Sequence, residues 1–219
     1  SRLVAQEIKR EKRDDLFAAT PPLEAKKMLF SLAVTKGYGY TDNKKTGMKI
    51  DLIDVKRAYF HARCKRDVYV QLPKEDHQEG MCGKLNMSMY GTRDAAQNWE
   101  EAYAEFMTSI GFRKGLASPC VFYHPKYKLR AVIHGDDFTL LGYGDNLDWF
   151  REQISGNFEV KFRGRLGPGP EDDKAIRILN RVVRWTAEGI RYEPDQRHAD
   201  IIVTKLGCLL YTSPSPRDA

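Results

Sequence analysis

The stretch from Leu129 to Leu141 holds two adjacent carboxylates between two short apolar runs. It reads Leu-Arg-Ala-Val-Ile-His-Gly-Asp-Asp-Phe-Thr-Leu-Leu, and the polar break begins at His134. Apolar runs interrupted by a Gly-Asp turn predict a β-hairpin with Asp136 and Asp137 at its tip. Two like charges this close raise each other's pKa unless a cation neutralises them. Because hard divalent cations prefer carboxylate oxygens, a metal site competes here with a plain solvent-facing turn.

A second acidic stretch lies upstream, in the apolar run from Ile50 to Val55. This run predicts a strand that carries Asp51 and Asp54 and then leads into an Ala/aromatic segment. The chain between Asp54 and Asp136 is long enough for a helix and further strands to bring the backbone back. Phosphoryl transfer with two metals needs carboxylates from separate strands around ions roughly 4 Å apart. The odd spacing places Asp51 and Asp54 on opposite faces of a strand, so we do not expect Asp51 to bind metal.

Helical periodicity predicts three amphipathic helices around these strands. The first begins at Thr20, with its hydroxyl as the N-cap. The second begins with Asp94 and Gln97 at capping-box spacing. The third has Asp145 as its N-cap. The apolar stripes expected to face the core are Ala25, Met28, Leu29, Leu32 and Ala33, then Trp99, Tyr103, Phe106 and Ile110, then Leu147, Phe150 and Ile154.

The C-terminal third is predicted to add strands and an acidic loop. Alternating apolar residues at 158–162 predict a strand. The Gly/Pro-rich stretch 164–173 is predicted to be a loop whose Asp172-Asp173 pair is solvated, because no apolar residues flank the pair to fix its geometry. Residues 175–192 are typical of a second hairpin, with basic groups suited to a nucleic-acid backbone. Those basic residues are Arg177, Arg181, Arg184 and Arg191.

Composition limits the class of protein. The 219 residues are 42% hydrophobic, enough for one good-sized domain or two small lobes. The formal net charge of +6 suits a polyanionic partner but is also common on ordinary surfaces. No apolar run approaches the length of a membrane span, and the four cysteines have neither C-x-x-C pairing nor zinc-ligand spacing. We therefore expect an intracellular protein with reduced thiols and no membrane partner.

Three motifs occur in the order of a reverse transcriptase palm. They are Asp54-Val-Lys-Arg-Ala-Tyr-Phe, Ser88-Met-Tyr-Gly-Thr-Arg-Asp-Ala-Ala-Gln-Asn-Trp99 and His134-Gly-Asp-Asp137. With Asp67-Val-Tyr-Val-Gln-Leu-Pro73 and Cys120-Val-Phe-Tyr, they make residues 1–207 resemble the Pol polyprotein of copia-type (Pseudoviridae) retrotransposons. The chain does not begin with Met, and it is interpreted as a reverse transcriptase fragment that would continue into a ribonuclease H domain and other Pol domains.

The resemblance implies an α+β fold of the right-hand polymerase type. A ferredoxin-like palm, in which helices back an antiparallel sheet, would be joined to partial fingers and a truncated thumb. The fingers would span residues 1–47, and the palm with the catalytic carboxylates residues 48–165. A primer-grip-like hairpin and the start of the thumb would span residues 166–207. Residues 208–219 resemble a translated sequencing adapter and would be a non-native tail.

The resemblance also implies roles for individual residues. Asp54 and Asp136 would be catalytic ligands of two Mg2+ ions, or of Mn2+ in their place, with Asp137 as a weaker or indirect partner. Tyr59 would lie under the sugar of the incoming nucleotide and clash with a ribose 2′-hydroxyl, although its position alone also suits a core aromatic. The further nucleotide contacts would be Arg2, Tyr90, Gly91 and Gln97, with Gln97 equally suited to capping, and the nucleic-acid contacts would be Arg93, Arg181 and Arg184.

These assignments imply an RNA-directed DNA polymerase, a reverse transcriptase fragment of an LTR retrotransposon. A primer 3′-hydroxyl would attack the α-phosphate of a deoxynucleoside triphosphate. The partners would be an RNA or DNA template-primer and the dNTP. The location would be cytoplasmic, in a virus-like particle.

Two other hypotheses stay open. The family typically has Tyr-Val before the Asp pair, where this chain has His134 and Gly135. This departure favours a catalytically decayed remnant with residual nucleic-acid binding. A two-metal nuclease or cyclase with the same palm is the third hypothesis, and Tyr59 and the Tyr90-Gly91 turn argue against it by resemblance. His134 itself could be a proton shuttle, a metal ligand or a half-buried hairpin residue.

Overall fold

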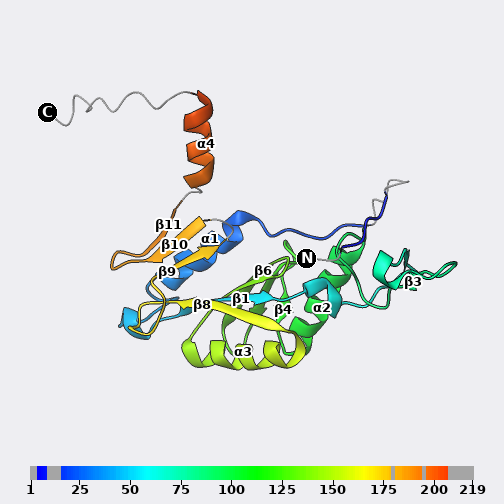
Figure 1. The fold of residues 1–219 in the computed structure, drawn as a ribbon. Coiled ribbons are helices and arrows are strands. Elements are labelled where there is room, and N and C mark those ends of the chain that lie inside the picture. The colour runs from blue at the N-terminus through cyan, green and yellow to red at the C-terminus, as the bar shows by residue number, and fades with distance from the viewer. Residues whose placement is uncertain (1–3, 9–15, 179–180, 194–195, 207–219) are drawn as a thin grey trace.

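The computed structural model describes residues 4–8, 16–178, 181–193 and 196–206, and it is built around a six-stranded antiparallel sheet (Figure 1). The strand order is β4-β5-β6-β7-β1-β8, so β1, the first of these strands in the sequence, lies between β7 and β8, the last two. The strands are β1 (Lys49–Val55), β4 (Arg113–Lys114), β5 (Val121–His124), β6 (Leu129–His134), β7 (Asp137–Gly142) and β8 (Val160–Leu166).

Smaller elements flank this sheet. Two short strands pair with each other, and a separate three-stranded antiparallel sheet has the order β11-β10-β9. In the described part of the chain no helix is long and apolar enough to cross a membrane. The flanking strands are β2 (Tyr69–Val70), β3 (Gly83–Lys84), β9 (Ala175–Ile178), β10 (Arg181–Trp185) and β11 (Ile190–Tyr192). The helices are α1 (Leu23–Ala33), α2 (Ala95–Ser109), α3 (Gly144–Asn157) and α4 (Gln196–Leu206).

The large sheet is buried on both faces by two separate hydrophobic cores. On one face, Ile53 and Val55 of β1 pack with buried residues of α2 and α3. On the other face, Ile50 and Leu52 pack with α1, β9 and β10. Successive side chains of a strand point to opposite faces, so β1 contributes to both cores in alternation. The expected α+β class is confirmed, with an antiparallel sheet covered by helices.

The predicted helices form, but none begins with the expected side-chain cap. Helix α1 begins at Leu23 rather than at Thr20, because two consecutive prolines precede it and a residue before proline is held extended. Asp94 occupies the N-cap position of α2, yet its carboxylate accepts hydrogen bonds from Arg66 and Asn98 instead of the helix backbone. Asp145 lies in the first turn of α3, not at its cap.

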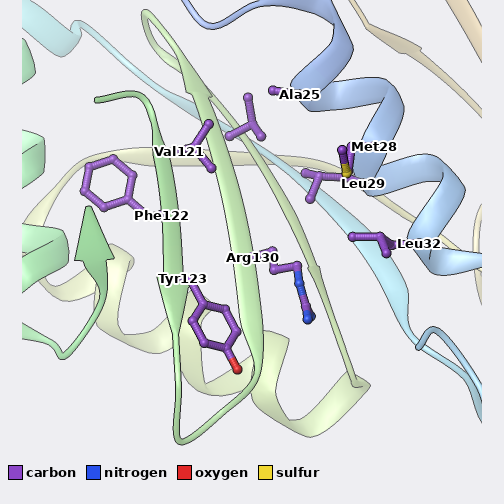
Figure 2. A pocket seen from close by; sticks show the side chains of 9 residues that line it. Ala25, Met28, Leu29, Leu32, Val121, Phe122, Tyr123 and Arg130 are labelled. Atoms are coloured by element: carbon purple, nitrogen blue, oxygen red, sulfur yellow. The ribbon is translucent and has the colours of Figure 1, made fainter. Parts of the chain in front are cut away.

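The apolar stripe predicted for α1 is only partly core. Leu29 and Ala33 are buried, but Met28 is 60% exposed. With Ala25 and Leu32, Met28 lines a groove of about 450 Å³ between α1 and strands β5 and β6 (Figure 2). The rotation of the helix about its axis that exposes Met28 buries Lys26 instead.

The Asp172-Asp173 pair was predicted to be solvated, and this prediction is wrong for Asp172, whereas Asp173 is exposed. Asp172 is only 7% exposed, and its carboxylate accepts hydrogen bonds from the Lys49 ammonium and the Gly169 backbone N–H, each at 2.7 Å. The Asp173 carboxylate accepts from the backbone N–H of Arg165 at 3.0 Å. These partners tie the loop between β8 and β9 to the sheet, so the pair is structural.

The predicted second hairpin is part of a three-stranded sheet. Strands β10 and β11 form the predicted hairpin, and β9 adds on the other side of β10. At the turn between β10 and β11 the backbone N–H of Thr186 donates to the Gly189 carbonyl at 2.7 Å. This sheet packs against α1 in the second core.

Asp51 is a fully buried carboxylate that ties β1 to α3 and β8. It accepts hydrogen bonds from Arg151 at 2.6 and 3.0 Å and from Arg165 at 2.6 and 2.9 Å. Arg165 also reaches Asp148 at 2.7 Å. As expected from the odd spacing, Asp51 lies on the face opposite Asp54 and serves the fold.

We predict that Asp51→Asn destabilises the fold by about 3 kcal/mol, because it leaves two partly buried guanidinium groups without their shared counter-charge. Urea unfolding measures the change. Asp148→Asn is the matched control, since Asp148 is 58% exposed in its pair with Arg165, and it should cost under about 1 kcal/mol. Equal losses in the two variants would contradict the prediction.

Lys26 is a buried amine on the inner face of α1. Lys26 is only 3% exposed, and its ammonium has no hydrogen-bond partner within the described ranges. Burial lowers the pKa of Lys26 from its ordinary value of 10.5, and the charge of Asp137 opposes this shift. The cost of burying this charge is therefore only partly offset.

We predict that Lys26→Met raises the free energy of unfolding at neutral pH by about 1–2 kcal/mol, because an unpartnered buried donor is removed. Since the folded-state pKa is lowered, the unfolded chain binds more protons between the two pKa values, and wild-type stability rises with pH there. The advantage of Lys26→Met should thus be greatest below the folded-state pKa and shrink toward pH 10.5. Denaturation curves at several pH values measure it. The exposed neighbour substitution Lys27→Met should show no such trend, and a pH-independent gain for Lys26→Met would refute the explanation.

Candidate active site

The structure brings Asp54, Asp136 and Asp137 together at one end of the large sheet. Asp54 lies near the end of β1, directly opposite Asp137 at the start of the antiparallel strand β7. Asp136 precedes Asp137 and lies in the turn between β6 and β7. Each carboxylate offers an oxygen, and these oxygens all lie within 4.8 Å of one another. The convergence that the sequence predicted across two strands is therefore present in the fold.

The turn that carries Asp136 is fixed from two sides. Gly135 has a φ of +62° and Asp136 does not have a positive φ, which is the type II′ pattern for a two-residue hairpin. The Asp136 carbonyl accepts a hydrogen bond from the Val55 N–H at 2.9 Å. The Trp99 indole N–H donates to the Gly135 carbonyl at 2.9 Å. Trp99, predicted only as a core residue of α2, also holds the turn that presents the carboxylates.

Two cations that were not predicted as partners of these carboxylates lie beside them. A guanidinium nitrogen of Arg163 on β8 is 2.6 Å from Asp54, and the other is 3.7 Å from Asp137. The second cation is the Lys26 ammonium of α1, whose positive charge interacts electrostatically with Asp137. Burial raises the pKa of Asp137, Asp136 and Asp54 raise it further, and Arg163 and Lys26 oppose the shift.

One of these cations left a signal in the sequence. Lys26 stands three, four and seven residues before Leu29, Phe30 and Ala33, so it occupies a position of the buried stripe of α1. A lysine in such a stripe indicates an unusual buried charge. The Arg163 contact depends on the pairing of β8 with β1, across more than a hundred residues of sequence, and has no local signal.

His134 ends β6 and pairs directly with Asp137 across the hairpin. It is half-buried. Burial lowers the pKa of His134 below its ordinary value, and the positive charge of Lys26 lowers it further, whereas Asp137 and Asp136 oppose the shift. The imidazole is therefore neutral at pH 7 and adds no positive charge to the cluster.

Tyr59 and Tyr90 form an aromatic pair beside the carboxylates. Tyr59 lies in the short 3-10 helix Ala58–His61 that follows β1. Its ring centroid is 4.3 Å from that of Tyr90, with 30° between the planes, and Phe60 meets Tyr90 edge-on at 5.9 Å. Burial raises the pKa of Tyr59, and the nearby Tyr90 and Asp136 charges raise it too.

Gly91 lets the N-terminal segment pack against this pair. Its φ is +96°, and a Cβ there would fall 1.7 Å from the carbonyl oxygen of Ala5. The Ala5 N–H donates to the Tyr90 carbonyl at 2.7 Å. Two residues on, the Glu7 carboxylate accepts from the Arg93 backbone N–H at 2.8 Å. A side chain at position 91 would prevent this contact.

The roles of the other residues predicted to bind substrate stay predictions. Gln97 is half-buried in the first turn of α2. Arg181 stacks over Tyr192 at 5.4 Å, and Arg184 pairs with Glu193 at 2.6 Å, both in the three-stranded sheet. Arg2 lies outside the described residues.

Comparison with known proteins identifies the family. Residues 1–167 match the family model described as reverse transcriptase (RNA-dependent DNA polymerase). Over 181 residues, 78% of this chain, it is 24% identical to the retrovirus-related Pol polyprotein from transposon TNT 1-94 of Nicotiana tabacum. The chain spans 13% of the length of that relative. The matched segment includes all three clustered carboxylates, and this chain belongs to the reverse transcriptase (RNA-dependent DNA polymerase) family.

Proposed function

We propose that this chain carries the palm of an RNA-directed DNA polymerase from a retrotransposon Pol polyprotein. The observation that supports this most directly is the convergence of Asp54, Asp136 and Asp137 within 4.8 Å, inside the segment that matches the reverse transcriptase family. The substrates would be a template-primer, with RNA or DNA as template, and a deoxynucleoside triphosphate. The site would act in the cytoplasm, in a virus-like particle, as part of a longer polyprotein.

The donor set fits divalent metal ions. Three carboxylates, two on the adjacent strands β1 and β7 and one in the turn before β7, offer the hard oxygen ligands that Mg2+ and Mn2+ prefer. Asp54 and Asp136 would be the principal ligands, with Asp137 as the weaker partner. Bound ions would supply charge neutralisation of the triphosphate and acidification of the primer hydroxyl.

The protein's own contribution is positioning. The Trp99 and Val55 hydrogen bonds hold the turn, so the carboxylates need little reorganisation when substrate binds. The Tyr59 ring, supported by Tyr90, would form the floor under the nucleotide sugar. Catalysis in this class is mostly orientation and electrostatic stabilisation, and these contacts serve both.

The proposed layout combines the topology with the family resemblance. The large sheet with α2 and α3 would be the palm, at residues 48–165, and residues 1–47 would belong to the fingers. The three-stranded sheet at 175–192 would grip the primer, and α4 would begin the thumb. Arg93, Arg181 and Arg184 would contact the nucleic-acid backbone, the last after leaving Glu193.

Primer extension on an RNA template with Mg2+ and dNTPs tests the proposed activity. We expect the full chain to extend the primer and Asp136→Asn to lower the rate by about 100-fold or more, because the shape is kept while a ligand charge is lost. Asp145→Asn, the same change at an exposed residue of α3, should leave the rate unaltered. Extension that survives Asp136→Asn, or no extension by the parent chain, would count against the proposal.

Sugar discrimination tests the role of Tyr59. Tyr59→Val should raise incorporation of ribonucleotides relative to deoxyribonucleotides by about tenfold or more, because it opens space for the 2′-hydroxyl. Tyr59→Phe keeps the ring and should preserve discrimination. Single-nucleotide incorporation assays with paired rNTP and dNTP measure the ratio. If Tyr59→Val discriminates as well as the parent, Tyr59 is a core aromatic only.

A further inference from the structure

Arg163 sits at an irregularity of the sheet that bears on the carboxylate cluster. Along the β1–β8 pairing, Ile53 lies opposite Phe162 and Leu52 lies opposite Gly164, so Arg163 is an extra residue between two paired positions. Such a bulge locally redirects side chains and is common beside functional sites. Here the redirected side chain is an arginine at the edge strand next to Asp54.

The guanidinium of Arg163 bridges two of the three clustered carboxylates. Its Nη2 is 2.6 Å from Oδ1 of Asp54 and its Nη1 is 3.7 Å from Oδ1 of Asp137. The Arg163 side chain is nevertheless 42% exposed, whereas those of Asp54 and Asp137 are 17% and 22% exposed. Because the arginine is already partly solvated in this pair, it can turn into solvent at less cost than a buried partner could.

Lys26 differs from Arg163 in its exposure and in its contact with the carboxylates. It is buried on the inner face of α1, and its ammonium influences the pKa of Asp137 without an ion-pair contact among the described residues. A buried amine cannot leave the carboxylates without unpacking the helix. The cluster therefore has one fixed cation and one cation that is free to move.

We propose that Arg163 is an exchangeable counter-ion of the carboxylate cluster, which neutralises Asp54 and Asp137 in the metal-free protein and leaves Asp54 when a divalent cation binds there. Lys26 remains in place in both states. This inference rests on the proposed function, because it takes the three carboxylates to be a metal site. The physical reason is competition, since the Asp54 carboxylate that accepts a hydrogen bond from Arg163 is also one of the three carboxylates that could hold a metal.

Direct titration of the full chain with Mn2+, with free Mn2+ followed by electron paramagnetic resonance, tests this without any catalysis. Arg163→Gln should bind Mn2+ about tenfold more tightly than the parent, because a competing positive charge is removed from the ligands. Arg163→Lys keeps the charge but cannot bridge both carboxylates, so its affinity should fall between the two. Arg113→Gln is the matched control, an exposed arginine on β4 at the opposite edge of the same sheet, and should bind like the parent.

Asp54→Asn makes the test specific. In that background Arg163→Gln should no longer tighten Mn2+ binding, because the exchanged contact is absent. Unchanged or weaker binding by Arg163→Gln, with binding still weakened by Asp54→Asn, would overturn the counter-ion proposal and leave the metal site intact. Absence of Mn2+ binding by the parent and every variant would overturn the metal site and the proposed function with it. Thermal unfolding without metal verifies that each variant is folded.

Discussion

The antiparallel register between β1 and β7 is the constraint on which the site depends. It places Asp54 directly opposite Asp137, and the two-residue turn then places Asp136 at the same end of the sheet. Because side chains alternate between the two faces, a slip of one residue would carry Asp54 to the α2–α3 side. Both faces of β1 are buried by different cores, so such a slip would also bury the wrong residues on each side. Packing of the whole sheet thus enforces the position of one carboxylate.

The two aspartates of β1 illustrate how the same side chain serves different ends on the two faces. Asp51 is fully buried and has four hydrogen bonds from Arg151 and Arg165, which satisfy its charge permanently. Asp54 is near the end of the strand, partly open to solvent, and among the described residues its direct ion pair is with Arg163. A saturated carboxylate holds elements together, whereas one with oxygens to spare can bind a ligand. The contrast comes from the partners and the exposure of each aspartate.

Local patterns predicted most of the site, and long-range partners were the part that could not be predicted. The hairpin at 129–141 and the opposite orientations of Asp51 and Asp54 follow from strand periodicity and turn chemistry, which act within a few residues. The burial of Asp172 depends on Lys49, which lies more than a hundred residues away in sequence. The residues that flank Asp172 therefore do not predict its burial. The side-chain cap predicted for α2 is missing because the Asp94 carboxylate is engaged by Arg66, whereas α1 begins late because two prolines precede it. The assignments of substrate contacts came from family resemblance, and the fold brings only some of those residues to the carboxylates.

The departure at His134 and Gly135 changes the support of the hairpin but not its carboxylates. Gly135 has a positive φ, a conformation that a β-branched residue adopts only with strain, and a Cβ there would meet no atom within 4 Å. Glycine therefore relaxes the backbone of the turn at a place where space is not limiting. His134 is neutral at pH 7, because burial and Lys26 lower its pKa, so it does not compete with a metal for Asp137. The carboxylates of Asp54, Asp136 and Asp137 remain within reach of a shared ion.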